Sequence, residues 1–108
     1  MNKVELIGEV AFLPVEVKYT SNGNAYCNTT IRASYTIEDG REFTSYVPIK
    51  AWGKEAERIG RTEQGEQLTM TGYINRSKWT DKEGNNHYNT EVTLQSVSGA
   101  DDKESAPF

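Results

Sequence analysis

The feature that most constrains the fold is a regular alternation of apolar and polar residues in short segments separated by turn signals. Within residues 3–10, for example, Val4 and Leu6 fall on one side of an extended chain, and Glu5 and Glu9 fall on the other. A period of two is typical of a β-strand with one buried face. The 108 residues suffice for one small core. The pattern therefore predicts a single all-β domain.

The alternation predicts five strands, at residues 3–10, 25–35, 41–52, 67–79 and 88–97. Between the third and fourth of these, residues 54–59 have helical spacing, with Ala56 and Ile59 apolar and Gly60 placed to end the helix. Three strands, a short helix and two further strands is the order of an OB-fold, a five-stranded Greek-key barrel. Other small β-barrels with one helix share this order.

The barrel is predicted to span residues 1–98. In residues 99–108 small and acidic residues replace the alternation, which predicts a disordered acidic tail. Asp101, Asp102 and Glu104 of this tail account for part of the formal net charge of -4. One face of the barrel can therefore still be locally basic, and the net charge does not exclude a nucleic-acid partner.

The residue inventory argues against catalysis, metal binding and membrane insertion. The single cysteine, Cys27, lies at a core-facing strand position, and the single histidine, His87, lies beside a turn. Neither has a partner at the spacing of a metal site or a catalytic triad, so we expect no enzyme, no metal and no cofactor. No apolar run approaches the roughly 20 residues of a membrane helix, and no signal-peptide pattern opens the chain. The single cysteine cannot form an internal disulfide, which fits a reducing cytosol.

One side of the third predicted strand combines aromatic residues with a cation. Alternation assigns four of its residues to the core, namely Phe43, Val47, Ile49 and Ala51. It leaves Tyr46, Lys50 and Trp52 on the outer side. Exposed aromatic rings stack on unpaired bases, at roughly 1–3 kcal/mol per base, and cations bind phosphates. Taken alone, one such aromatic would more often pack under a loop or against another subunit.

The fourth predicted strand repeats the combination of aromatic and basic residues. Its core side is predicted to hold Leu68, Met70, Gly72 and Ile74. The strand then runs into Arg76, Lys78 and Trp79, next to a loop that contains Lys82. Together the two segments predict a face that binds single-stranded nucleic acid.

Three segments resemble bacterial and phage single-stranded DNA-binding proteins, the SSB family. NKVELIGEVAFLPVEVKYTSNGNAYCNTTIRAS is similar to the opening strand pair of the family, and YVPIKAWGKEAE to its third strand and helix entry. GEQLTMTGYINRSKWTDKEGNNHYNTEV is similar to its Lys-Trp-Thr-Asp loop and the strand that follows. The resemblance implies sequence-tolerant binding and protection of single-stranded DNA in replication, recombination and repair. It also implies location in the bacterial cytosol or nucleoid, or in the host cytoplasm for a phage protein.

The resemblance further implies particular site residues. The DNA-stacking aromatics of the family match Tyr35, Tyr46, Trp52 and Trp79, and its basic positions match Lys3, Lys18, Lys54 and Lys78. Charge and strand geometry add Arg32, Lys50 and Arg76 as phosphate contacts. Tyr35 has the parity of the core-facing residues of its strand, so the strand end or a twist of the hairpin must turn it outward.

Members of the family are generally homotetramers whose first strands pair across a dimer axis. The resemblance therefore implies a tetramer, with a dimer as the alternative, formed through the edge at residues 4–7. Glu9 departs from the family, which usually has a neutral polar residue there. This departure predicts weaker attraction for phosphates along the adjacent groove.

In the resembled family an acidic tip that ends in Pro-Phe docks replication and repair proteins. The matching residues here are Asp101, Asp102, Glu104, Pro107 and Phe108. Phe108 would fill an apolar pocket while the carboxylates steer toward a basic rim. The alternative is a frayed end whose acidic residues aid solubility.

Two other interpretations stay open. A primosomal-type OB-fold protein would be a protein-interaction module with weaker single-strand binding, but such relatives generally lack the acidic ending with Pro-Phe. A cold-shock-like RNA-binding barrel would need closely spaced Phe-rich strand motifs, which this sequence lacks. Incidental RNA binding is compatible with the sequence, because base stacking does not sense the 2′-OH.

Overall fold

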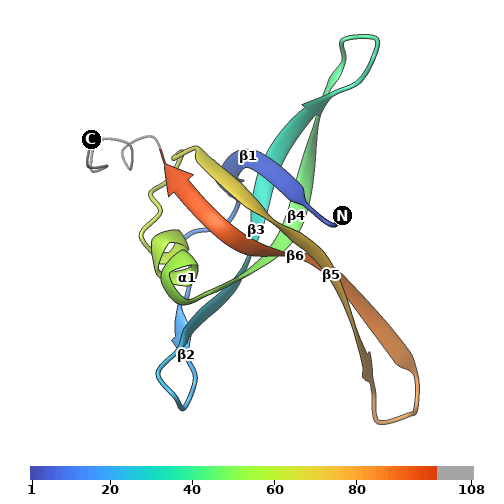
Figure 1. The fold of residues 1–108 in the computed structure, drawn as a ribbon. Coiled ribbons are helices and arrows are strands. Elements are labelled where there is room, and N and C mark those ends of the chain that lie inside the picture. The colour runs from blue at the N-terminus through green and yellow to red at the C-terminus, as the bar shows by residue number, and fades with distance from the viewer. Residues whose placement is uncertain (100–108) are drawn as a thin grey trace.

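The computed structural model describes residues 1–99, which form six β-strands and one helix (Figure 1). The strands are β1 Val4–Val10, β2 Lys18–Tyr19, β3 Ala25–Thr36, β4 Glu42–Trp52, β5 Leu68–Thr80 and β6 Asn86–Gly99, and the helix α1 is Gly53–Gly60. The five predicted strands are confirmed, and so is the predicted helix between the third and the fourth of them. The two-residue strand β2 was not predicted, because two residues are too few to show an alternation.

Five of the strands close into a barrel. The sheet order is β1-β5-β6-β4-β3, and β3 pairs back onto β1. This closing contact is short, because β1 and β3 pair only at Glu9 with Arg32 and at Val10 with Ile31. Contact between β4 and β6 is parallel, whereas the other strand pairs are antiparallel. The predicted all-β fold, a closed five-stranded barrel with one short helix, is therefore confirmed.

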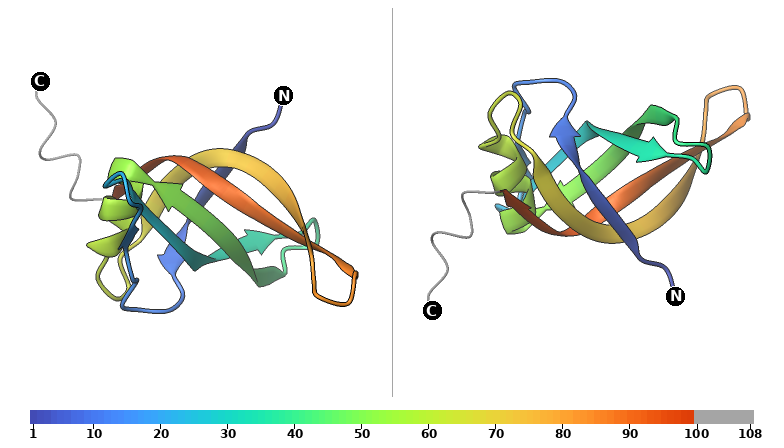
Figure 2. Two further views of the ribbon diagram at one scale, coloured as in Figure 1. Left: turned by 90° about the horizontal axis from the view of Figure 1, so that it is seen from below. Right: turned by 90° about the horizontal axis from the view of Figure 1, so that it is seen from above.

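The core fills the barrel and continues under the helix. The largest fully buried side chains are Cys27, Ile31, Ile49, Ile59, Leu68 and Met70. Helix α1 packs against β3, β4 and β6, and it covers one end of the barrel (Figure 2). Burial raises the pKa of the Cys27 thiol through desolvation, as expected for a cysteine that serves as a small apolar side chain.

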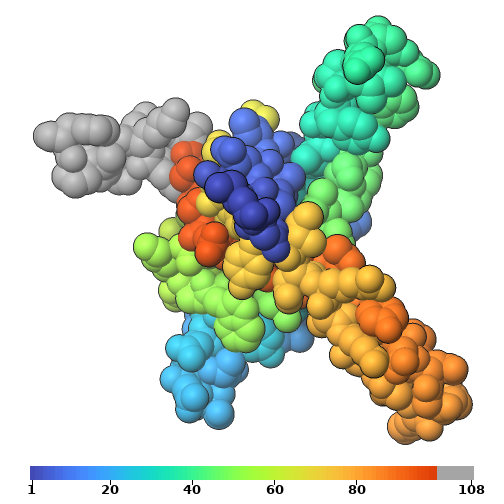
Figure 3. Space-filling view, turned by 45° about the vertical axis from the view of Figure 1, so that its right-hand side comes forward, coloured from blue at the N-terminus to red at the C-terminus, as the bar shows by residue number. Residues whose placement is uncertain are grey.

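Two strand pairs extend beyond the barrel as projecting arms (Figures 1 and 3). We call the end of the β3–β4 pair, residues 34–44, the β3–β4 arm, and the end of the β5–β6 pair, residues 74–90, the β5–β6 arm. Phe43 and Ile74 lie in these arms and are exposed, so their predicted place in the core is wrong. Alternation assigns a side chain to one side of a strand, but it does not show where the opposing sheet ends.

Two further findings bear on function. Within residues 1–99, no helix is long and apolar enough to cross a membrane. The same residues contain no cluster of three or more His, Cys, Asp or Glu side chains that would hold a metal ion.

Candidate nucleic-acid interface

One continuous side of the barrel wall carries five of the eleven candidate DNA-contact residues, namely Arg32, Tyr46, Lys50, Trp52 and Trp79. We call it the outer face, meaning the side of β3, β4, β6 and β5 that points away from the core. It includes Tyr26, Asn28, Arg32, Tyr46, Lys50, Trp52, Tyr73, Trp79, His87 and Glu91. These residues share one side because cross-strand partners in a sheet point the same way.

Trp52 lies at the helix end of the outer face, in the last position of β4. Gly53 follows with a φ of 59°, a left-handed conformation that suits glycine and lets the chain turn directly into α1. The Trp52 ring lies 5.3 Å from the ring of its cross-strand partner Tyr26, at an interplanar angle of 31°. Lys50 Nζ lies 6.0 Å from the centre of the Trp52 ring. Lys18 of β2 pairs with Tyr26 and extends this corner with a second cation.

Tyr46 lies further along β4, next to Arg32 of β3. The Arg32 guanidinium forms an ion pair with Glu9 of β1. Hydrogen bonds to Glu9 first and to Tyr46 second raise the pKa of Arg32 above its ordinary value. The candidate phosphate contact Arg32 is therefore already bound to a carboxylate.

Lys50 also has a carboxylate partner. Its Nζ lies 3.5 Å from Glu91 Oε1 of the neighbouring strand β6. Lys18 forms a looser contact with Glu16, at 4.0 Å between two highly exposed side chains. Lys3 and Lys54 are exposed, and within residues 1–99 neither has an ion-pair partner.

The β5–β6 arm has two different faces. Trp79 and His87 pair across the strands on the outer face, and their rings stack at 4.3 Å with an interplanar angle of 18°. Arg76 and Lys78 have the opposite parity and lie on the other face, where the Arg76 guanidinium lies 4.2 Å from the Tyr88 ring centre. Arg76, Lys78 and Trp79 are close in sequence, but they do not form one cluster on the surface. Alternation along the strand contains this signal.

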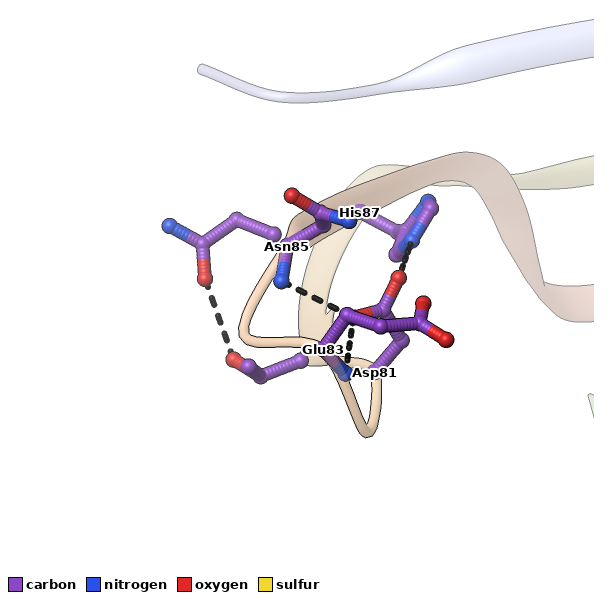
Figure 4. A network of polar contacts seen from close by, with 6 residues as sticks. Asp81, Glu83, Asn85 and His87 are labelled. Atoms are coloured by element: carbon purple, nitrogen blue, oxygen red, sulfur yellow. Dashed lines mark hydrogen bonds and ion pairs between the residues drawn. The ribbon is translucent and has the colours of Figure 1, made fainter.

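Asp81 organises the turn at the tip of the β5–β6 arm (Figure 4). Its Oδ1 accepts hydrogen bonds from the backbone N–H groups of Glu83, at 3.0 Å, and Asn85, at 2.8 Å. Its Oδ2 lies 2.8 Å from His87 Nε2. Because an ionised carboxylate only accepts hydrogen bonds, Nε2 is the donor. Asp81 thus fixes the imidazole that stacks on Trp79.

Tyr35 lies outside the outer face. It keeps the parity of the core-facing residues of β3, and it is exposed because it lies in the β3–β4 arm, where no opposing sheet covers it. Its ring stacks on that of Phe43 at 5.7 Å, with an interplanar angle of 27°. Position along the arm, rather than a turn of the side chain toward the outer face, makes Tyr35 accessible.

Tyr26 and Tyr73 are outer-face aromatics that were not among the predicted site residues. Tyr73 pairs with Thr93 of β6, which on its other side pairs with Lys50 of β4, so Tyr73 and Lys50 lie in one row across three strands. Both tyrosines have outer-side parity, so the signal was present in the alternation of their strands. Their proximity to Trp52 and Lys50 depends on the register between strands, which the sequence does not show.

Fold and outer face together define a class of protein, the small OB-type barrels that display aromatic rings beside cations on one wall. The single-strand binding protein family matches residues 1–99, and the chain belongs to this family.

Three curated proteins illustrate the relationship. Single-stranded DNA-binding protein 1 of Clostridium acetobutylicum is 30% identical, over 98% of this chain and 99% of its own length. Single-stranded DNA-binding protein 2 of the same organism is 34% identical, over 90% of this chain and 74% of its own length. The single-stranded DNA-binding protein of Caldanaerobacter subterraneus subsp. tengcongensis is 34% identical, over 90% of this chain and 66% of its own length.

Acid should loosen the tip of the β5–β6 arm through Asp81. Hydrogen bonds from His87 first and from the Asn85 backbone second lower the pKa of the Asp81 carboxyl. Its contribution to stability is therefore complete above the unfolded pKa of about 3.9 and is lost as the pH falls through the lower folded pKa. In an NMR acid titration, the amide signal of Asn85, whose N–H donates to Asp81 Oδ1, should shift with a midpoint below about 3.9.

The Asp81→Asn variant is the control for this titration, because its side chain does not ionise. It should remove the acid-dependent shift from the Asn85 amide signal. A midpoint at or above about 3.9 in the unmodified protein would contradict the role given to Asp81.

Proposed function

We propose that this protein binds and protects single-stranded DNA without sequence preference. The observation that carries the proposal is the set of half-exposed aromatic rings on the outer face. Tyr46, Trp52 and Trp79 are 55%, 45% and 50% exposed. A polar solution penalises such rings unless they meet a partner, and the flat face of an unpaired base is a suitable one.

The spacing of these rings suits an extended strand rather than one small ligand. Tyr46 and Trp52 are six residues apart on β4, which corresponds to about 20 Å along a strand. They would therefore contact different bases. Because every base has a π-face, stacking of this kind tolerates any sequence.

Cations around the outer face would bind the phosphates of the same strand. The proposed contacts are Lys3, Lys18, Arg32, Lys50, Lys54, Arg76 and Lys78. Tyr35 in the β3–β4 arm is a fourth proposed stacking residue, beyond the outer face. Arg76 and Lys78 lie on the far side of the β5–β6 arm from Trp79, so a strand that reaches them would pass around this arm. Binding of this kind involves no bond breaking and no cofactor.

Removal of an outer-face indole should weaken DNA binding. Trp52→Ala and Trp79→Ala should each lose on the order of 1–3 kcal/mol of binding free energy for a dye-labelled oligo-dT, measured by fluorescence anisotropy. Tyr19→Ala is a matched control, because Tyr19 is exposed but pairs with Ala25 and has the opposite parity to Lys18 and Tyr26. The Tyr19→Ala variant should bind oligo-dT with the affinity of the unmodified protein.

Two results would contradict this assignment. Full affinity in both tryptophan variants would show that other residues stack on the bases. No binding of oligo-dT by the unmodified protein, or equal affinity for duplex DNA, would overturn the proposed function. The protein-interaction module would then be the better interpretation.

The proposed assembly is a homotetramer, with a dimer as the alternative. One edge of β1 is paired with β5 along residues 4–8, whereas the other edge meets β3 only at Glu9 and Val10. Ile7 is exposed beside this open edge. Such an edge favours pairing with another chain.

Light scattering should give the mass of four chains at micromolar concentration, and Ile7→Lys should lower it, because a lysine on an edge strand opposes pairing. Asn22→Lys, an exposed change in the turn between β2 and β3 and away from this edge, controls for the added charge. A mass of one chain for the unmodified protein would contradict the assembly.

The proposed role in replication, recombination and repair depends on residues outside the described part of the chain. Asp101, Asp102, Glu104, Pro107 and Phe108 would recruit partner proteins in the bacterial cytoplasm, or in that of a phage host. The carboxylates would favour partners with a basic rim, and the aromatic ring an apolar pocket.

Pull-down from a bacterial extract should recover replication and repair proteins with the full chain and lose them when residues 101–108 are deleted. Phe108→Ala should lose most of the same proteins. Equal recovery with and without these residues would show that they recruit nothing.

A further inference from the structure

Two cations on the outer face are each held by a carboxylate from a neighbouring strand. Arg32 of β3 is ion-paired with Glu9 of β1, and Lys50 of β4 with Glu91 of β6. The pairs lie on the same wall of the barrel as Tyr46 and Trp52. Both cations therefore meet an anion of the protein at the positions where they would meet a phosphate.

The two carboxylates are held in place by the sheet. Glu9 is the direct cross-strand partner of Arg32 at the closure of the barrel, and its side chain is 32% exposed. Glu91 is 16% exposed and lies two residues before Thr93, the partner of Lys50. Partial burial of this kind reduces screening by solvent and salt, so these contacts persist better than the exposed pair of Lys18 with Glu16.

We propose that Glu9 and Glu91 occupy the phosphate-binding positions of Arg32 and Lys50 in the free protein and thereby limit its affinity for DNA. This inference rests on the proposed single-strand binding. A DNA phosphate that reaches either cation exchanges one anion for another. The displaced carboxylate then either stays beside the DNA backbone, where its charge repels the phosphates, or moves away and loses its ion pair with the cation.

The salt dependence of binding reports this exchange directly. A cation that neutralises a phosphate of a single strand contributes about −0.7 to the slope of log K against log [salt], because it releases condensed counterions. A cation whose charge is already balanced by a carboxylate contributes little, because the carboxylate cancels its attraction for the phosphate. Arg32 and Lys50 should therefore contribute almost nothing to the slope of log K against log [salt] in the unmodified protein.

Replacement of either glutamate by glutamine tests the inference. Gln has the size of Glu and keeps an oxygen that accepts a hydrogen bond from the cation, but it lacks the charge. Glu9→Gln and Glu91→Gln should each bind dye-labelled oligo-dT about 5-fold more tightly at 0.1 M salt, with a slope steeper by about 0.7. The double variant should gain about 25-fold at the same salt concentration, with a slope steeper by about 1.4.

A matched control separates this local effect from the general effect of a lower negative charge. Glu57 is an exposed residue of α1, at the covered end of the barrel, and the structure shows no ion pair for it within residues 1–99. Glu57→Gln should change the affinity less than 2-fold at 0.1 M salt. Thermal unfolding followed by circular dichroism shows that each variant is folded.

A double-mutant cycle shows whether Glu9 acts through Arg32. In an Arg32→Gln background, the gain from Glu9→Gln should fall to that of the Glu57→Gln control. In a Lys50→Gln background, the gain from Glu91→Gln should fall in the same way. A gain that persists without the paired cation would assign the effect to general charge and overturn the inference.

The remaining outcomes are also decisive. If the unmodified protein binds oligo-dT but Glu9→Gln and Glu91→Gln match the control, the carboxylates do not compete with DNA. Weaker binding by these variants would show that the carboxylates orient the cations for DNA, the opposite of the inference. If the unmodified protein does not bind oligo-dT, the proposed function fails and the inference fails with it.

Discussion

The short contact between β1 and β3 is the constraint on which the rest of the structure depends. Two residue pairs, Glu9 with Arg32 and Val10 with Ile31, convert a curved sheet into a closed barrel. The contact requires a glycine at position 8, because a Cβ atom there would overlap the Arg32 carbonyl oxygen. Closure buries Val10 and Ile31 and fixes the curvature of the wall that carries the outer face. It leaves the first half of β1 with one unpaired edge.

The same contact links the fold to the electrostatics of the outer face. Neighbouring residues of β1 point to opposite sides, so the register that places Val10 in the core necessarily places Glu9 outside, against Arg32. The proposed competition between carboxylate and phosphate is thus a consequence of how the barrel closes. A net charge of -4 describes such a face poorly, because what matters is which cation faces which anion.

Beyond the barrel, the side chains of the two arms pack differently from those of the barrel. Their strands keep pairing, but no opposing sheet covers either side, so aromatic rings find partners within the arm. Trp79 stacks on His87, Tyr35 stacks on Phe43, and Arg76 lies over Tyr88. Each partner limits the orientations of its ring without covering all of it. If the proposed stacking residues meet bases, this arrangement would reduce the entropy lost on stacking.

The sequence by itself determined the strands, the helix, the order of the barrel and the family, because these depend on local alternation, turns and motifs. It also contained the side of each strand on which Trp52, Tyr46 and Tyr26 lie. Only the tertiary structure decided where the core ends, which exposes Phe43 and Ile74. It also decided that Glu9 and Glu91 would face Arg32 and Lys50. These outcomes depend on register and closure between strands far apart in the chain. A pattern of period two fixes the side of a strand, but it does not distinguish registers that differ by two residues, so it does not show which residues meet across strands.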